Sequence, residues 1–163
     1  MADYSKITEL DINTDNVATI DYSELTGLNN LYFNGNTALN VDIENATFPT
    51  TLRKIYFYDT ISTGDLSAAS FPVGMRTIIG NNCTTISYGA SNGFASLTYA
   101  TLNIQLINCG LSETEVDAIL ADLVAGSINT GTLDISSNTV PSATGLTDKG
   151  TLVGRGWTVT TDV

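Results

Sequence analysis

The feature that most constrains this chain is a segment that recurs at a fixed interval. The segment 45–55 reads Asn-Ala-Thr-Phe-Pro-Thr-Thr-Leu-Arg-Lys-Ile, and the segment 68–78 reads Ala-Ala-Ser-Phe-Pro-Val-Gly-Met-Arg-Thr-Ile, so that Phe, Pro, Arg and Ile coincide. A weaker copy begins at Phe94, which follows Phe71 by the same interval as Phe71 follows Phe48. A fixed period of about 20 to 50 residues is typical of folds that stack one structural unit, so this repeat restricts the fold before any local element is assigned.

A wider search finds three spaced apolar residues followed by a small polar residue or cysteine, written apolar-x-x-apolar-x-apolar-x-x-Asn/Cys/Thr. The last position of the pattern falls at 15, 36, 60, 83, 109 and 138. This pattern and its spacing resemble the signature of leucine-rich repeats, whose period is about 20 to 29 residues. The apolar positions are Ile7, Leu10 and Ile12; Leu28, Leu31 and Phe33; Leu52, Ile55 and Phe57; Met75, Ile78 and Gly80; Ile104 and Leu106; and Leu133 and Ile135.

The pattern predicts an α/β fold: a leucine-rich-repeat-like solenoid with a short-stranded parallel sheet, an irregular convex side and a C-terminal helix-strand cap. Each apolar-x-apolar core predicts a short strand whose alternate side chains point inward. Stacked copies are expected to pair in parallel over one hydrophobic core that no single copy could close alone. We expect one domain over residues 1–163, with repeats over about 7–140 and the cap over about 141–163.

Both cysteines of the chain, Cys83 and Cys109, fall on the polar position of the repeat. The residue there has to satisfy buried backbone groups through its side chain, as an asparagine amide does and a thiol or hydroxyl can. We therefore interpret both as buried, reduced thiols. A disulfide between neighbouring copies is the alternative, because adjacent strands lie ~4.8 Å apart. Gly80 occupies an inward position, which predicts a thin spot in the fourth layer.

One helix is predicted clearly, after Leu111. Ser112 and Glu115 form a capping box, and Gly126 marks the end of the helix. Between them, apolar residues follow at helical spacing. We interpret the acids of the first turn as favourable to the helix dipole and not as catalytic carboxylates. The apolar residues are Val116, Ile119, Leu120 and Leu123, and the acids are Glu113, Glu115 and Asp117.

A C-terminal cap is predicted from Pro141 onward. A second short helix is expected around Leu146, Leu152 and Val153, followed by a last strand in which Trp157 and Val159 alternate with threonine. We interpret the tryptophan as a core residue and not as a platform for a ligand.

Composition disfavours several functions. The chain has no histidine, which removes the commonest general base and zinc ligand. Acids outnumber bases 17 to 6, and the net charge of −11 disfavours nucleic-acid backbones and anionic membrane surfaces. No apolar run approaches the ~20 residues of a membrane span, and the start of the chain does not resemble a secretory signal. Because motifs for nucleotide, metal or nucleophile chemistry are also missing, we expect neither an enzyme nor a cofactor.

The C-terminal part carries the motifs Val116-Asp-Ala-Ile-Leu-Ala-Asp-Leu, Gly131-Thr-Leu-Asp-Ile-Ser, Pro141-Ser-Ala and Gly154-Arg-Gly-Trp-Thr-Val-Thr. These motifs resemble structural proteins of tailed bacteriophages and related elements, including those of Bacteroidetes hosts. The resemblance implies a virion component on the capsid surface, a fibre or a tail. It transfers no binding residue to this chain.

A candidate binding surface follows from the strand pattern, because residues between the inward positions face out on the concave side of the sheet. Three tyrosines are expected to gather there on adjacent strands. Exposed tyrosines among amides suit stacking on sugar rings or anchoring a protein. Cross-strand pairing that only stabilises the sheet is the alternative interpretation. The surface, called the tyrosine patch below, comprises Tyr32, Tyr56 and Tyr58 with Asn30, Asn34 and Lys54.

The N-terminal end of the predicted stack has little to cover it, because the first copy begins at Ile7. Either residues 2–6 form a minimal cap or another chain covers this end, and we favour a partner subunit. The expected function is a non-enzymatic virion structural or surface-binding protein. It would contact other virion proteins or a host-surface protein or glycan, in a larger assembly or homo-oligomer. A bacterial cell-surface adhesion module and a protein-binding scaffold are the alternatives.

Overall fold

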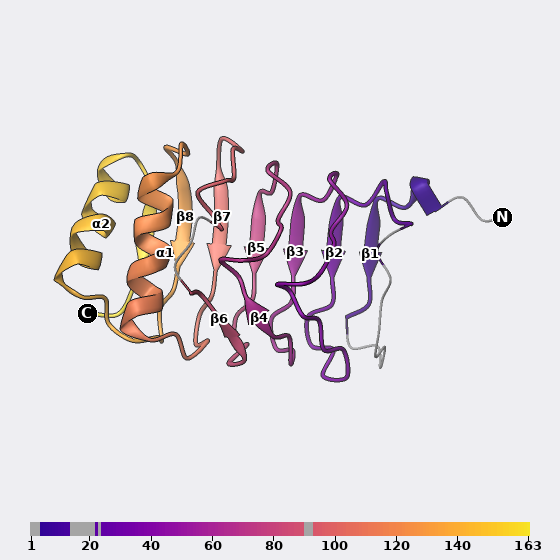
Figure 1. Cartoon of the computed structure of the whole chain (residues 1–163), viewed down its shortest axis with the longest axis horizontal. Helices are drawn as coiled ribbons and strands as arrows, with labels where there is room; N and C mark the ends of the chain where they lie inside the picture. The colour runs from indigo at the N-terminus through magenta and orange to yellow at the C-terminus, as the bar shows by residue number, and fades with distance from the viewer. Residues whose placement is uncertain (1–3, 14–21, 23, 90–92) are drawn as a thin grey trace.

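The computed structural model describes residues 4–13, 22, 24–89 and 93–163 of the chain. Within these ranges the chain forms an α/β fold with a seven-stranded parallel sheet and two α-helices at the C-terminal end (Figure 1). The strands lie side by side in chain order along the molecule. They are β1 (Glu9–Asp11), β2 (Asn30–Tyr32), β3 (Lys54–Tyr56), β5 (Thr77–Ile79), β7 (Leu102–Gln105), β8 (Gly131–Asp134) and β9 (Thr158–Thr160).

The register of the sheet follows the repeat. An apolar residue of the repeat pattern lies at the centre of every strand of this sheet before β9, and Val159 of the predicted cap continues the row in β9. These residues pair with one another across every neighbouring strand. In the middle of the sheet they are fully buried, whereas in the two end strands they are only partly buried. The predicted short parallel strands are therefore confirmed. The central residues are Leu10, Leu31, Ile55, Ile78, Ile104, Leu133 and Val159.

The polar position of the repeat lies inside the molecule and hydrogen-bonds to the backbone. At its C-terminal end, the Asn138 amide donates to the carbonyl of Leu106 at 2.7 Å and accepts from the N–H groups of Cys109 and Leu111. Asp15, which the pattern placed first, lies outside the described residues. The described polar positions, called the buried polar row below, are Asn36, Thr60, Cys83, Cys109 and Asn138, of which Asn138 is only partly buried.

Both cysteines are buried and free, so the interpretation as reduced thiols is confirmed. Each thiol replaces the asparagine amide as a donor to the preceding turn of the chain. Cys83 Sγ donates to the Phe57 carbonyl at 3.0 Å, and Cys109 Sγ donates to the Gly80 carbonyl at 3.1 Å. Burial raises the pKa of both thiols, and that of Cys109 reaches about 12.

The predicted thin spot at Gly80 is wrong. The ring of Phe57, from the preceding turn, fills the space that a larger side chain would need, since a Cβ at Gly80 would lie 2.3 Å from that ring. Phe57 in turn stacks on Phe33, with ring centroids 6.1 Å apart. An aromatic side chain in one layer therefore compensates for a missing side chain in the next.

The side opposite the main sheet is more regular than predicted. Two segments there, β4 (Gly64–Asp65) and β6 (Ile86–Ser87), pair in parallel as a second, two-stranded sheet. Buried aromatic rings also follow one another from turn to turn, with centroids 5.7, 6.0 and 6.3 Å apart. The prediction of an irregular side is therefore wrong for these turns. The aromatic row consists of Tyr22, Phe48, Phe71 and Phe94.

The first helix agrees with its prediction residue by residue. α1 (Glu113–Ala125) begins after the N-cap Ser112, whose capping box with Glu115 is complete, and ends at the C-cap Gly126. Its buried apolar residues are Val116, Ile119, Leu120 and Leu123.

The C-terminal cap is also present as a helix followed by a strand. α2 (Ala143–Gly154) packs beside α1, and β9 adds the last strand to the sheet. Of the three apolar residues expected in the helix, Leu152 is buried, whereas Leu146 and Val153 are exposed. Trp157 is buried and its indole N–H donates to the Ile128 carbonyl at 3.2 Å, which confirms it as a core residue.

At the other end, a 3-10 helix (Tyr4–Lys6) precedes β1. It lies close against the second turn of the chain, since a Cβ at Gly27 would be 1.9 Å from the Ser5 carbonyl oxygen. Ile7 and Leu10 pack against the core but are only partly buried. Residues 2 and 3 of the predicted minimal cap lie outside the described residues, so the partner subunit at this end stays a prediction.

Candidate binding surface

One face of the main sheet is turned away from the core and carries two rows of side chains. Because side chains alternate along a strand, the residues on either side of each central residue point outward, although Thr77 among them is only 8% exposed. The register aligns them across the strands. One row is Glu9, Asn30, Lys54, Thr77, Asn103, Thr132 and Thr158; the other is Asp11, Tyr32, Tyr56, Ile79, Gln105, Asp134 and Thr160.

The tyrosine patch is centred on two stacked rings. Tyr32 of β2 and Tyr56 of β3 are register partners, and their ring centroids are 4.8 Å apart with 24° between the ring planes. Both side chains are partly exposed. The separation equals the usual distance between adjacent strands, so each ring stands above its own strand and faces its neighbour. The predicted gathering of these two tyrosines is therefore observed.

Polar groups lie along the base of the stacked pair. Asn30 and Lys54 are register partners in the other row, and in each strand the buried central residue separates them from the tyrosine. The Asn30 amide donates to Glu9 Oε2 at 3.0 Å, which links β2 to the acidic strand β1. Burial raises the pKa of Tyr32, and the charge of Glu9 raises it further, with smaller contributions from Tyr56 and Asp11. The negative charges of Glu9 and Asp11 on β1 therefore act on the Tyr32 hydroxyl.

The other two residues of the patch follow their strands and are partly exposed. Asn34 and Tyr58 come shortly after Tyr32 and Tyr56, and the Tyr58 carbonyl accepts the N–H of Gly35 at 2.9 Å. Among the described rings, the stacked pair consists of Tyr32 and Tyr56 and does not extend to Tyr58. The structure therefore brings two of the predicted tyrosines together as a unit and leaves the third beside it.

The patch predicted from the sequence left out two acidic side chains beside it, although the repeat pattern places both at outward-facing positions of the first copy. Glu9 and Asp11 are exposed on β1, directly beside Asn30 and Tyr32 in the register. The signal that could have identified them is their position in the pattern, because they flank Leu10 as Asn30 and Tyr32 flank Leu31.

The remaining conspicuous carboxylates support the fold. Asp122 of α1 is buried and accepts hydrogen bonds from the Tyr88 hydroxyl and from the Phe94 N–H, at 2.9 Å for the latter. Asp117 accepts from the N–H and hydroxyl of Ser142 and so holds the start of α2. Among the described residues, no group of three or more acidic or cysteine side chains is placed to hold a metal ion.

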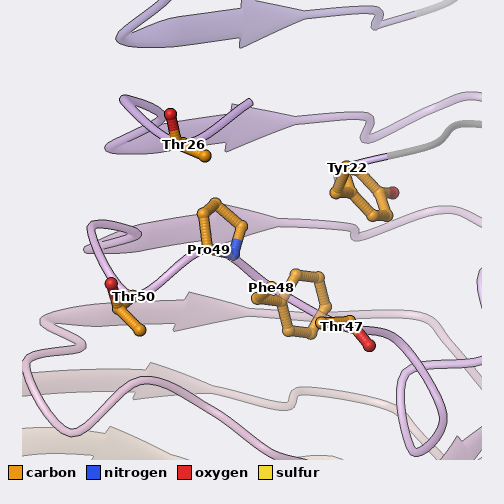
Figure 2. Close-up of a pocket in the computed structure, with 6 residues that line it drawn as sticks. All are labelled: Tyr22, Thr26, Thr47, Phe48, Pro49 and Thr50. Carbon is orange, nitrogen blue, oxygen red and sulfur yellow. The ribbon is translucent and has the colours of Figure 1, made fainter. Parts of the chain in front are cut away.

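A small cavity of about 260 Å³ lies at the N-terminal end of the aromatic row (Figure 2). It is smaller than the roughly 300–1,000 Å³ of typical ligand sites. Tyr22 and Phe48 stand beside it with their ring centroids 5.7 Å apart. We interpret it as the gap left where the aromatic row ends. It is lined by Tyr22, Thr26, Thr47, Phe48, Pro49 and Thr50.

Neither helix of the described part of the chain is long and apolar enough to cross a membrane. Comparison with protein-family models, with curated proteins and with solved structures found no match to this chain. The binding surface is therefore the basis on which a function can be argued.

Proposed function

We propose that the chain is a leucine-rich-repeat-type solenoid that acts without catalysis, by presenting the outward face of its sheet to another molecule. The solenoid is supported by strands that pair in chain order at intervals of about 20 to 29 residues, the period of leucine-rich repeats. The observation that carries the binding role is the partly exposed Tyr32–Tyr56 stack on that face. Aromatic side chains supply a large share of the binding energy at protein surfaces.

We further propose that this surface belongs to a virion component, a capsid decoration, fibre or tail module, which contacts other virion proteins or a host-surface protein or glycan. The support is the resemblance of the C-terminal motifs to phage structural proteins. A bacterial cell-surface adhesion module and a protein-binding scaffold would use the same surface.

Immunogold labelling and mass spectrometry of purified particles from the source culture test this role. We expect an antibody against the chain to label particles, and the labelled position to identify the capsid, fibre or tail. Label confined to cell surfaces or to the cell interior would contradict the virion role and favour the adhesion module or the scaffold respectively.

A further inference from the structure

We propose that the tyrosine patch binds a basic segment of a partner protein, with an arginine or lysine side chain seated between the Asp11 carboxylate and the outer face of the Tyr32 ring. The inference rests on the proposed binding function and specifies the chemistry of the partner. It follows from the order of side chains along one row of the sheet, which is Asp11, Tyr32 and Tyr56.

The two stacked rings differ in what their outer faces meet: that of Tyr56 is turned toward Ile79 of β5, and that of Tyr32 toward β1. Tyr32 and Tyr56 cover each other's inner faces at 4.8 Å, so the outer face of Tyr32 is turned toward β1. Asp11 is its register partner there and is exposed. Side chains stand roughly perpendicular to a sheet, so the carboxylate and the ring face border one gap. Because an aspartate side chain is shorter than a tyrosine side chain, a planar guanidinium can stack on the outer part of the Tyr32 ring and donate to the carboxylate below it.

The charges around the gap favour a cation. Glu9 adds a second carboxylate on the same strand, and the Asn30 amide holds it toward β2 at 3.0 Å. Asp11 Oδ1 accepts the backbone N–H of Asn13 at 3.1 Å, which supplies no compensating full charge. Lys54 of β3 is the register partner of Asn30 on the side away from β1. Its positive charge repels a cation near β3, so a cation is favoured near the carboxylates of β1. The chain as a whole, at −11, attracts basic partners.

A glycan fits this arrangement less well. Sugar rings stack on broad aromatic faces, but Tyr32 and Tyr56 use one face each for their mutual contact. The remaining face of Tyr32 borders a carboxylate, with which a guanidinium or ammonium forms a charged pair, whereas a sugar hydroxyl donates only a single hydrogen bond to it.

The test is a titration of the full chain, with ¹³C-labelled tyrosine, followed by NMR. The probe is a tripeptide blocked at both ends that carries two arginines around a glycine, and its control carries citrulline in place of arginine. We expect the ring signals of Tyr32 and Tyr56 to shift and saturate with the arginine peptide only. Asp11→Asn should weaken the affinity about fivefold, as expected for losing an exposed ion pair beside a cation–π contact.

The matched control is Glu113→Gln, which removes the same charge from the exposed first turn of α1, far along the chain from the patch. It should change the affinity by less than about twofold, because exposed charges beyond about 10 Å are screened at ordinary salt. Equal losses of affinity in Asp11→Asn and Glu113→Gln would overturn the proposal, as would ring signals that shift equally with the citrulline and arginine peptides. So would ring shifts that appear with methyl glucoside and not with the arginine peptide. If the arginine peptide binds as expected but the antibody does not label particles, only the virion role is contradicted.

Discussion

One residue in each of five successive turns has a left-handed backbone, directly before the buried polar row. Gly35 takes this position in the first of these turns, and the later turns use residues that carry side chains. Asparagine and aspartate tolerate a positive φ better than other residues with side chains. The repeat pattern specified the buried polar position but not the left-handed position before it, because the residue type at the left-handed position changes from turn to turn. The positions are Gly35, Asp59, Asn82, Asn108 and Ser137.

Enlarging Gly80 should destabilise the protein, because the Phe57 ring already occupies the space next to it. Gly80→Ala would place a Cβ 2.3 Å from the Phe57 ring, so we expect a loss of about 1–3 kcal/mol in the free energy of unfolding. Gly150→Ala is the control, since nothing lies within 4 Å of its Cβ and alanine favours a helix such as α2. Urea unfolding of both variants tests this, and equal stability of the two would contradict it.

The two cysteines should be protected from alkylation in the folded protein. Burial raises the pKa of both thiols, to about 12 for Cys109, so at pH 8 both are mainly protonated, and burial also denies the reagent access. We expect mass spectrometry to find neither residue modified by iodoacetamide in buffer and both modified in urea without reductant. Protection that persists in urea would instead indicate a disulfide between them.

Helix α1 could be predicted from sequence because its signals are local. The capping box at Ser112 and Glu115 and the helical spacing that follows involve residues within a few positions of one another. β4 and β6 carry no comparable signal, because each is a two-residue pairing formed only when neighbouring turns stack. Gly64, with a φ of +108°, lies where a Cβ would be 2.9 Å from the Glu44 backbone, so its role depends on a contact distant in sequence.

The docking of α2 should depend on Asp117, whose carboxylate accepts the N–H and the hydroxyl of Ser142. Asp117→Ala leaves these donors at the helix start without their acceptor, so we expect a loss of about 1–2 kcal/mol, within the range for hydrogen bonds to a charged group. Amide hydrogen exchange should quicken in α2 more than in the sheet. Glu113→Ala, an exposed change on the same helix, should cost less than about 0.5 kcal/mol. Equal effects of the two variants would contradict the role of Asp117.

The regular spacing of the chain explains how much of the molecule its sequence could predict. The repeat indicated which side chains of each strand face out, and hence Tyr32 and Tyr56 as neighbours. It could not show that the rings stack, because ring orientation depends on packing across the sheet. Nor did it separate binding from sheet stabilisation, since a stacked pair on an accessible face serves both. The repeat also placed Glu9 and Asp11 on the outward face, and the register of β1 with β2 shows that Asp11 is the direct neighbour of Tyr32.

Acid should weaken the contacts between turns that depend on Asp65 and Glu115. Burial alone would raise the pKa of each carboxyl, but hydrogen bonds to Asp65 from Ser67 and Gly89, and to Glu115 from Ser112 and Tyr88, outweigh it. Both pKa values therefore lie below the ordinary 3.8 and 4.5. A lowered pKa in the folded state stabilises the protein above the unfolded pKa, and this contribution is lost as pH falls through the folded value.

Protonation of the other acids also relieves repulsion within a chain of charge −11, so the pH profile of the wild type alone would mix two opposing effects. The difference between the wild type and the double variant Asp65→Asn, Glu115→Gln isolates the specific contribution, because the other acids are common to both. We expect the urea midpoint of the wild type to exceed that of the variant most at pH 7. This difference in midpoint should become smaller as the pH falls below 4.5. A difference in midpoint that stays constant down to pH 2 would show that these hydrogen bonds do not favour the ionised carboxylates.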